Sequence, residues 1–215
     1  LVADRRRHAA EERRHFGARL REAENVIDEE KHVVSLIAEI FGDRQAGEVR
    51  RALREPIAGL PLRDRLRAAG ASRRSTVAIS VCDGTRAQPR DVMVPVILEE
   101  IADQVALDNI TILVATGTHR GNNDQELREM LGDVVTSTVR VINHDARDPD
   151  SLVWCGHAGN GVPVWLNRIW MEADIKITTG FVEPHFFAGF SGGPKMVAPG
   201  LAKGDGCPGD GVGAS

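Results

Sequence analysis

The sequence predicts an α/β protein with a mostly parallel sheet and helices on both faces, preceded by a charged helical segment. Two observations carry this prediction. Apolar, β-branched segments alternate along the chain with segments of helical periodicity. The apolar segments also lack an alternation of apolar and polar residues, which is typical of strands buried on both faces. With 215 residues and a hydrophobic content of 42%, the chain can bury a sizeable core.

Residues 1–47 are expected to form charged helices that carry little functional information. Glu and Arg recur there at spacings of three and four residues, which support solvated helices. The run Arg5-Arg6-Arg7 could indicate a nucleic-acid arm, but residues 1–54 hold 12 Lys and Arg against 11 Asp and Glu. This balance favours a solvated helical face.

The α/β domain is predicted over residues 48–202. Its first strand is expected within residues 75–86 and ends at the polar cluster Asp83-Gly84-Thr85-Arg86. Residues 89–109 have helical periodicity, and Pro95 should either kink that helix or delay its start.

The same pattern then recurs. A second strand is expected within residues 109–121 and ends at the cluster Thr116-Gly117-Thr118-His119-Arg120. A short helix is expected over residues 123–133, where Asn123 and Glu126 have the spacing of a capping box.

Two further strands are expected, within residues 139–146 and 173–185, with a mixture of short strand and helix over residues 161–173 between them. They end at the clusters Asn143-His144-Asp145-Ala146 and Glu183-Pro184-His185. In open α/β sheets, ligands bind outside the carboxyl ends of the strands. The four polar clusters are therefore expected to converge on one edge of the sheet.

Charge and cysteine content exclude several classes of function. A net charge of -4 provides no basic field for nucleic acid or an anionic membrane. The cysteines Cys82, Cys155 and Cys207 are widely spaced without a CxxC pair, which argues against a disulfide framework and a zinc ribbon. No apolar run approaches the roughly 18 residues of a membrane span, and the charged N-terminus is no signal peptide. We therefore expect a cytoplasmic protein without nucleic-acid or membrane partners.

Histidines are the candidate acid-base groups. His119 and His185 follow separate predicted strands, and two imidazoles that face one pocket can deprotonate a ligand on one side and protonate it on the other. A metal-dependent hydrolase based on His119, His144 and His185 is an alternative, and His157 could also join a metal cluster, although no HxH or HExxH spacing supports one. A purely structural role for each histidine remains open.

The stretch EPHFFAGFSGGPKMVAPG, residues 183–200, is too rich in Gly and Pro for a regular helix or strand. It is not a Walker loop, because Pro194 separates Lys195 from the preceding glycine. Its backbone amides could still bind an anion, at Ser191, Gly192 and Gly193. The alternative is a tight turn with a surface lysine.

Arg86 could bind a carboxylate or phosphate through two hydrogen bonds, while Asp83 orients a hydroxyl or a neighbouring base. A local ion pair that caps the turn is the alternative. Arg120, beside His119, has the same ambiguity.

In their order and separation, these motifs resemble the N-terminal domain of the nickel-pincer lactate racemase family. The resemblance rests on four segments: DGTR (83–86), GTHRG (117–121), NHDA (143–146) and PHFFAGFSGGPKMVAPG (184–200). It covers roughly residues 48–202. It implies an α/β domain of an enzyme that racemises or epimerises 2-hydroxy acids.

The resemblance also implies a nickel pincer nucleotide (pyridinium-3,5-bisthiocarboxylic acid mononucleotide) attached covalently to Lys195. His119 and His185 match the two family histidines that exchange the hydroxyl proton, while the Cα hydrogen moves as a hydride to and from the cofactor. The implied partners are a small 2-hydroxy acid and the cofactor-biosynthesis proteins. The implied cofactor contacts are Lys195, Asp83, Thr85, Arg86, Ser191, Gly192 and Gly193. The implied substrate contacts are Arg86 and Arg120.

The sequence departs from the family pattern near its end. Family members continue into a second domain and carry a nickel-ligating histidine beyond the Pro-Gly pair, whereas no histidine follows His185 here. Residues 203–215 are expected to form a disordered Gly-rich tail. The sequence thus predicts no protein ligand for nickel and little racemase activity for this chain alone. A non-catalytic fragment that binds cofactor or metal is the alternative.

Overall fold

The computed structural model describes residues 44–158, 161–180, 183–185 and 189–204. The helices predicted before residue 44 and the tail predicted after residue 204 lie outside the described residues. The elements in chain order are α3 (Arg44–Arg54), α4 (Leu62–Ala68), β1 (Val77–Cys82), α5 (Arg90–Ile101), η1 (Leu107–Asn109), β2 (Ile110–Ala115), α6 (Asp124–Leu131), α7 (Asp133–Thr138), β3 (Arg140–Asn143), η2 (Pro149–Ser151), β4 (Leu152–Ala158), β5 (Val162–Asn167), α8 (Arg168–Glu172), β6 (Ile175–Thr178), β7 (Pro184–His185), β8 (Gly189–Phe190) and η3 (Gly193–Met196).

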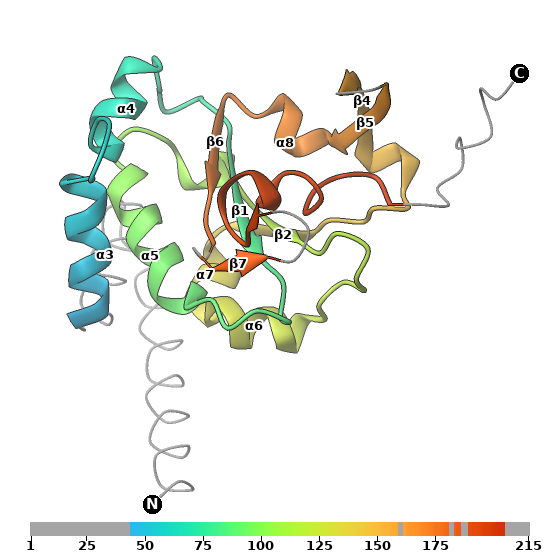
Figure 1. Cartoon of the computed structure of the whole chain (residues 1–215). Helices are drawn as coiled ribbons and strands as arrows, with labels where there is room; N and C mark the ends of the chain where they lie inside the picture. Colours follow the sequence, from blue (N-terminus) through green and yellow to red (C-terminus); the bar gives the residue numbers. More distant parts are fainter. Residues whose placement is uncertain (1–43, 159–160, 181–182, 186–188, 205–215) are drawn as a thin grey trace, which may run out of the picture.

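Four strands form a parallel sheet in the order β3-β2-β1-β6. Strands β6, β1 and β2 of this sheet are labelled in Figure 1. Val77 of β1 lies opposite Ile110 of β2 on one side and opposite Ile175 of β6 on the other. Every residue of β1 is buried, as expected for a central strand covered on both faces. The predicted α/β class with a mostly parallel sheet is confirmed.

Each face of the sheet packs against helices. Neighbouring residues of a strand point to opposite faces, so Ile79 and Ala78 of β1 enter different cores. Ile79 packs in the larger cluster with Leu98 of α5. Ala78 packs in a smaller cluster with Trp170 of α8 and with Leu201 of the C-terminal segment.

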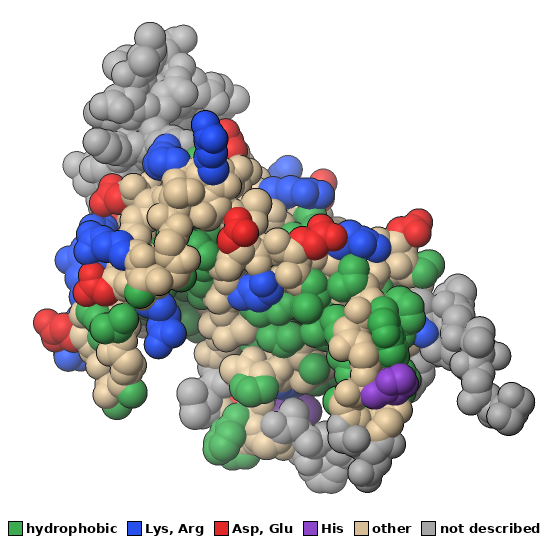
Figure 2. All heavy atoms as spheres, turned by 90° about the horizontal axis from the view of Figure 1, so that it is seen from above, with side chains coloured by type: hydrophobic (Ala, Val, Ile, Leu, Met, Phe, Trp, Pro, Cys, Tyr) green, Lys and Arg blue, Asp and Glu red, His purple; other side chains and the backbone are tan. Residues whose placement is uncertain are grey.

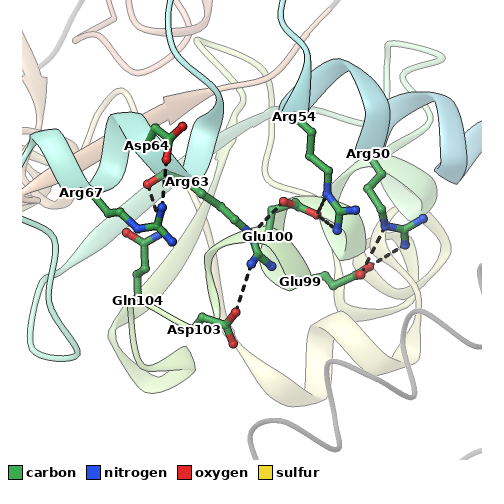
Figure 3. A network of polar contacts seen from close by, with 9 residues as sticks. All are labelled: Arg50, Arg54, Arg63, Asp64, Arg67, Glu99, Glu100, Asp103 and Gln104. Atoms are coloured by element: carbon green, nitrogen blue, oxygen red, sulfur yellow. Dashed lines mark hydrogen bonds and ion pairs between the residues drawn. The ribbon is translucent and has the colours of Figure 1, made fainter.

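Helices α3 and α4 lie outside α5 and are joined to it by ion pairs (Figure 3). Glu100 of α5 has a side chain that is only 1% exposed. Its carboxylate accepts hydrogen bonds from Nε of Arg54 (2.9 Å) and Nε of Arg63 (3.0 Å). Glu99 pairs with Arg50 at 2.6 Å. Because a buried carboxylate is tolerated only when it is paired and hydrogen-bonded, Glu100 ties both outer helices to α5.

The structure excludes one of the two alternatives for Pro95 and corrects the extent of the fourth strand. Helix α5 begins at Arg90 and continues through Pro95, so the proline does not delay its start, although it has no N–H to donate. The fourth strand of the sheet ends at Thr178 and does not reach His185. The chain leaves the sheet near Gly180, and residues 183–185 belong to a separate pair of short strands, β7 and β8.

The predicted capping box is present, because Asn123 Oδ1 accepts from Glu126 N and Glu126 Oε2 accepts from Asn123 N. The predicted mixture over residues 161–173 is β5 followed by α8.

An antiparallel hairpin of β4 and β5 was not predicted from the sequence. It pairs Trp154 with Trp165, and it leaves Trp154 47% and Val162 60% exposed. Hydrophobic side chains gather on the side of the molecule where this hairpin lies (Figure 2). Among the described residues, no helix is long and apolar enough to cross a membrane.

Candidate active site

The turns that follow β1 and β2 leave the sheet side by side. Cys82, the last residue of β1, lies opposite Ala115, the last residue of β2, in parallel register. The C-terminal segment reaches the same edge, because the carbonyl of Gly200 accepts a hydrogen bond from the amide of Gly117 (3.0 Å). Three segments far apart in the sequence therefore meet at the carboxyl edge of the sheet, where ligands bind in open α/β folds.

Asp83 and His119 form a hydrogen-bonded pair at this edge. Nδ1 of His119 lies 2.6 Å from Oδ2 of Asp83. The other oxygen, Oδ1, accepts hydrogen bonds from the amide (3.2 Å) and the hydroxyl (2.6 Å) of Thr85. Burial raises the pKa of Asp83, but the hydrogen bonds from Thr85 and His119 outweigh it and hold the pKa below its ordinary value. Asp83 is therefore an anion at neutral pH.

The ionised Asp83 determines where His119 carries its proton. A carboxylate only accepts hydrogen bonds, so Nδ1 of the ring must be the donor. In the neutral ring, Nε2 is then left unprotonated and can take a proton. The side chain of His119 is 59% exposed, whereas that of Asp83 is 7% exposed. This is the arrangement of a general base held in one tautomer by a buried carboxylate.

Glu183 links the turn after β1 to the segment that carries Lys195. Its Oε1 accepts hydrogen bonds from Nη1 of Arg86 (3.3 Å) and from the hydroxyl of Ser191 (2.8 Å). Its backbone carbonyl accepts from the amide of Ser191 (3.0 Å). Ser191 is buried, while the side chain of Arg86 is partly exposed. A guanidinium has five N–H donors, so Arg86 retains donors for an anionic ligand.

Lys195 lies in η3, and its neighbour Met196 fixes this short helix on β1. The hydroxyl of Ser80 donates to the carbonyl of Met196 (3.1 Å), and Sγ of Cys82 lies 3.5 Å from Sδ of Met196. Burial raises the pKa of Cys82, and the charges of Arg90 and Lys195 oppose that rise. The turn that carries Lys195 is therefore held against the end of β1 through Met196.

Two glycines let the backbone pack closely around η3. A Cβ at Gly200 would lie 2.8 Å from the carbonyl oxygen of Met196 and 2.9 Å from that of Lys195. A Cβ at Gly180 would lie 2.9 Å from Cα of Gly192. Because these neighbours are backbone atoms that cannot swing away, a side chain at either position would displace the turn.

The structure places the remaining predicted residues as follows. His185 is half-buried in β7, two residues beyond Glu183. Gly193 is exposed at the start of η3, in the left-handed region of backbone conformation (φ 59°). Arg120 binds both carboxylate oxygens of Glu126, at 2.8 and 2.6 Å. This pairing lowers the pKa of Glu126 to about 2. In this structure Arg120 thus supports the capping box of α6.

His144 has a structural position. Its Nε2 donates to the carbonyl of Ala202 (2.9 Å), and its Nδ1 accepts from the amide nitrogen of Asn167 (3.2 Å). The side-chain oxygen of Asn167 caps α8, which fixes the orientation of that amide. Both ring nitrogens of His144 are therefore occupied, which leaves none for a metal in the alternative based on three histidines. Across the described residues, no group of three or more His, Cys, Asp or Glu could hold a metal ion.

Sequence reasoning missed two polar residues of this edge, Gln88 and Arg90, and assigned no role to Glu183 within its predicted cluster. Oε1 of Gln88 accepts from the amide of Cys82 (2.9 Å), and Nε2 donates to the hydroxyl of Thr179 (2.7 Å). Gln88 thereby joins the ends of β1 and β6. Nothing in the local pattern marks these residues, apart from their position beside the polar clusters.

The parallel sheet defines an α/β domain, and the oriented imidazole and the lysine-bearing turn at its carboxyl edge make a candidate acid-base site. The family model for the lactate racemase N-terminal domain matches residues 21–208, and the chain belongs to this family. The match extends beyond the predicted range 48–202 at both ends.

Two curated relatives are similar over most of this chain. The lactate racemase of Thermoanaerobacterium thermosaccharolyticum is 36% identical over 155 residues, which are 72% of this chain and 35% of the relative. The lactate racemase of Lactiplantibacillus plantarum is 33% identical over 181 residues, which are 82% of this chain and 42% of the relative. The chain thus spans about two fifths or less of the length of these relatives.

Solved structures agree with the fold. The lactate racemase apoprotein from T. thermosaccharolyticum superposes with a TM-score of 0.67 at 35% identity, over 74% of this chain and 37% of that one. A crystal structure of a Thermotoga maritima protein has a TM-score of 0.57 at 23% identity, over 74% and 38% of the two chains, and shows the fold alone.

Proposed function

We propose that this chain is the cofactor-bearing domain of a nickel-pincer-dependent racemase or epimerase of 2-hydroxy acids. The observation that carries the proposal is the Asp83–His119 pair, which leaves an unprotonated imidazole nitrogen at the edge of the sheet that also carries Lys195. The two relatives named lactate racemase support the reaction class.

The reaction assigns a task to each side chain. Nε2 of His119 takes the hydroxyl proton of one enantiomer, and His185 serves the other enantiomer in the same way, since inversion requires a base for each face of the substrate. Arg86 binds the substrate carboxylate with the donors that Glu183 leaves unused. Arg120 is a weaker candidate for this contact, because Glu126 already occupies its guanidinium.

The residues fit attachment of a nucleotide better than they fit a protein metal cage. Lys195 offers an amine on a turn where glycine permits close approach of a bulky group, and Gly192 and Gly193 offer backbone amides beside it. Ser191 is a weaker candidate for this contact, because its amide already donates to the carbonyl of Glu183. Within the described residues, by contrast, no group of three metal ligands exists. When bound, the nickel pincer nucleotide would accept the Cα hydrogen as a hydride and return it. The cofactor-biosynthesis proteins and a small 2-hydroxy acid are then the partners of the chain.

Intact mass measurement tests this proposal. The chain is produced together with cofactor-biosynthesis proteins, and we expect an added nucleotide mass that Lys195→Ala abolishes. Lys203→Ala is the matched control and should keep the adduct, because Lys203 lies over the ring of Trp165 in β5 and is not part of η3. An adduct that survives Lys195→Ala, or no adduct in the unsubstituted chain, would contradict the proposal. An adduct without interconversion of any 2-hydroxy acid would favour a non-catalytic cofactor-binding domain.

A further inference from the structure

We propose that Arg90 is a positioning residue that holds Asp83 and Arg86 in their working geometry. This inference rests on the proposed function, since it concerns the same site. Arg90 touches neither a candidate base nor the carboxylate-binding face of Arg86. It contacts the backbone of the turn that carries Asp83 and Arg86.

The contacts of Arg90 join the two ends of this turn. Its Nη1 donates to the carbonyl of Asp83 (3.1 Å) and to the carbonyl of Arg86 (3.0 Å). The amide of Arg86 also donates to the carbonyl of Asp83 (3.2 Å), which closes the turn. Nη1 of Arg90 therefore fixes the backbone of both Asp83, which orients His119, and Arg86, the proposed carboxylate-binding residue.

The burial of Arg90 has no local explanation. The residue is only 5% exposed, and its Nε has no hydrogen-bond partner among the described residues. Its hydrogen bonds go to carbonyl oxygens, whereas the acidic groups Cys82, Asp83 and Asp91 act on it only at a distance. Burial consequently lowers the pKa of its guanidinium. An arginine at the first position of a helix also opposes the helix dipole.

These penalties would be avoided by an apolar side chain of similar length, which could fill the same space. What such a side chain could not supply is the pair of hydrogen bonds to the turn. Without them, the carbonyls of Asp83 and Arg86 lose a buried donor, and the turn can relax toward solvent. The Asp83 carboxylate would then move relative to Nδ1 of His119, and the proton of the imidazole would no longer be held on that nitrogen.

Ring nitrogen NMR of the 215-residue chain tests this inference without any cofactor. The ¹⁵N shifts of His119, assigned with His119→Gln, report the ratio of its two neutral tautomers. Arg90→Met and Arg90→Gln should shift this ratio toward Nε2–H by about three- to tenfold, as expected for loss of a charge-assisted bond. Arg90→Lys keeps a charged donor but is too short to reproduce both bonds, so it should shift the ratio in the same direction by a smaller factor than the two neutral variants. The exposed Arg128→Met is the control and should leave it unchanged.

A wild-type ratio in either folded neutral variant overturns the inference, as does equal disturbance by Arg90→Lys and Arg90→Met. If Arg90→Met and Arg90→Gln both fail to fold, the test depends on Arg90→Lys. Its shorter side chain cannot reproduce both hydrogen bonds at their present lengths, so an unchanged His119 tautomer ratio in this variant overturns the inference. The mass measurement on Lys195 fails or succeeds independently of these shifts. If the unsubstituted chain acquires no nucleotide adduct but the Arg90 variants shift the His119 tautomer ratio as expected, the proposed function is refuted and the positioning role of Arg90 stands.

Discussion

Replacing Asp83 with asparagine tests the oriented base directly. The side chain keeps its size, but its oxygen must stay at the Oδ1 position, because Thr85 donates two hydrogen bonds there. The amide nitrogen then faces Nδ1 of His119 as a donor. Nδ1 must become an acceptor, so the ring proton moves to Nε2. The nitrogen that should take the substrate proton is thereby blocked.

The size of the effect follows from the bond that is lost. A hydrogen bond to a charged group contributes about 1.5–3 kcal/mol, and we take the lower end because His119 is 59% exposed to competing water. This corresponds to a change of about tenfold in the tautomer ratio. The carboxylate also stabilises the ring once it is protonated, so the catalysed rate should fall by about 10- to 100-fold. His119→Ala, which removes the base entirely, should cost about 10²- to 10⁴-fold.

Two measurements check this expectation. Ring ¹⁵N shifts should show Nδ1–H in the wild type and Nε2–H in Asp83→Asn. In any cofactor-loaded form of the protein that interconverts a 2-hydroxy acid, kcat/KM should fall equally for both enantiomers, because the equilibrium constant of a racemisation is one. The exposed Asp108→Asn serves as the control. Retention of the wild-type tautomer and rate in Asp83→Asn would refute the oriented-base reasoning.

Three further predictions concern stability, and urea unfolding measures each. Glu100→Ala should lower the free energy of unfolding by about 2–3 kcal/mol, because its two arginines lose a buried partner but can turn into solvent. The exposed Asp64→Ala should cost less than about 0.5 kcal/mol. Equal losses of unfolding free energy in Glu100→Ala and Asp64→Ala would contradict the structure. Gly200→Ala should cost about 1–3 kcal/mol, because its Cβ would lie 2.8 Å from a backbone oxygen. Gly47→Ala, whose Cβ meets nothing within 4 Å, should instead be neutral or stabilising by up to about 1 kcal/mol. Burial lowers the pKa of His144, so stability should be full above about pH 6.5 and fall as pH drops toward the folded-state pKa. His144→Gln should flatten this dependence, and an unchanged slope would mean that another group titrates.

The sequence predicted the features that local patterns encode. An apolar run that stops at Asp83 marks both a buried strand and the start of a polar turn, and the same holds for β2 and its following loop. The capping box of Asn123 and Glu126 is likewise a matter of spacing along one helix. Such signals need only the residues within a few positions, so a single sequence contains them.

The features that were missed depend on contacts between distant segments. Glu183 acquires its role from Arg86, which lies 97 positions away in the sequence. The hairpin of β4 and β5 has a register shift next to Gly156 and exposes much of its surface, so it shows no clean alternation of apolar and polar residues. The fourth strand was predicted too long because its apolar pattern continues past Thr178, whereas the strand ends there and Gly180 packs closely against Gly192.

Strand β1 sets the geometry of both halves of the candidate site. Ser80 and Cys82, near its end, hold Met196 and therefore the turn that carries Lys195. The next residue, Asp83, orients His119 from the same strand end. The distance between the lysine and the imidazole is thus determined by one buried strand whose residues are all inaccessible to solvent. A substitution that shifts the end of β1 should disturb nucleotide attachment and the His119 tautomer together, whereas a change in η3 alone should affect only attachment.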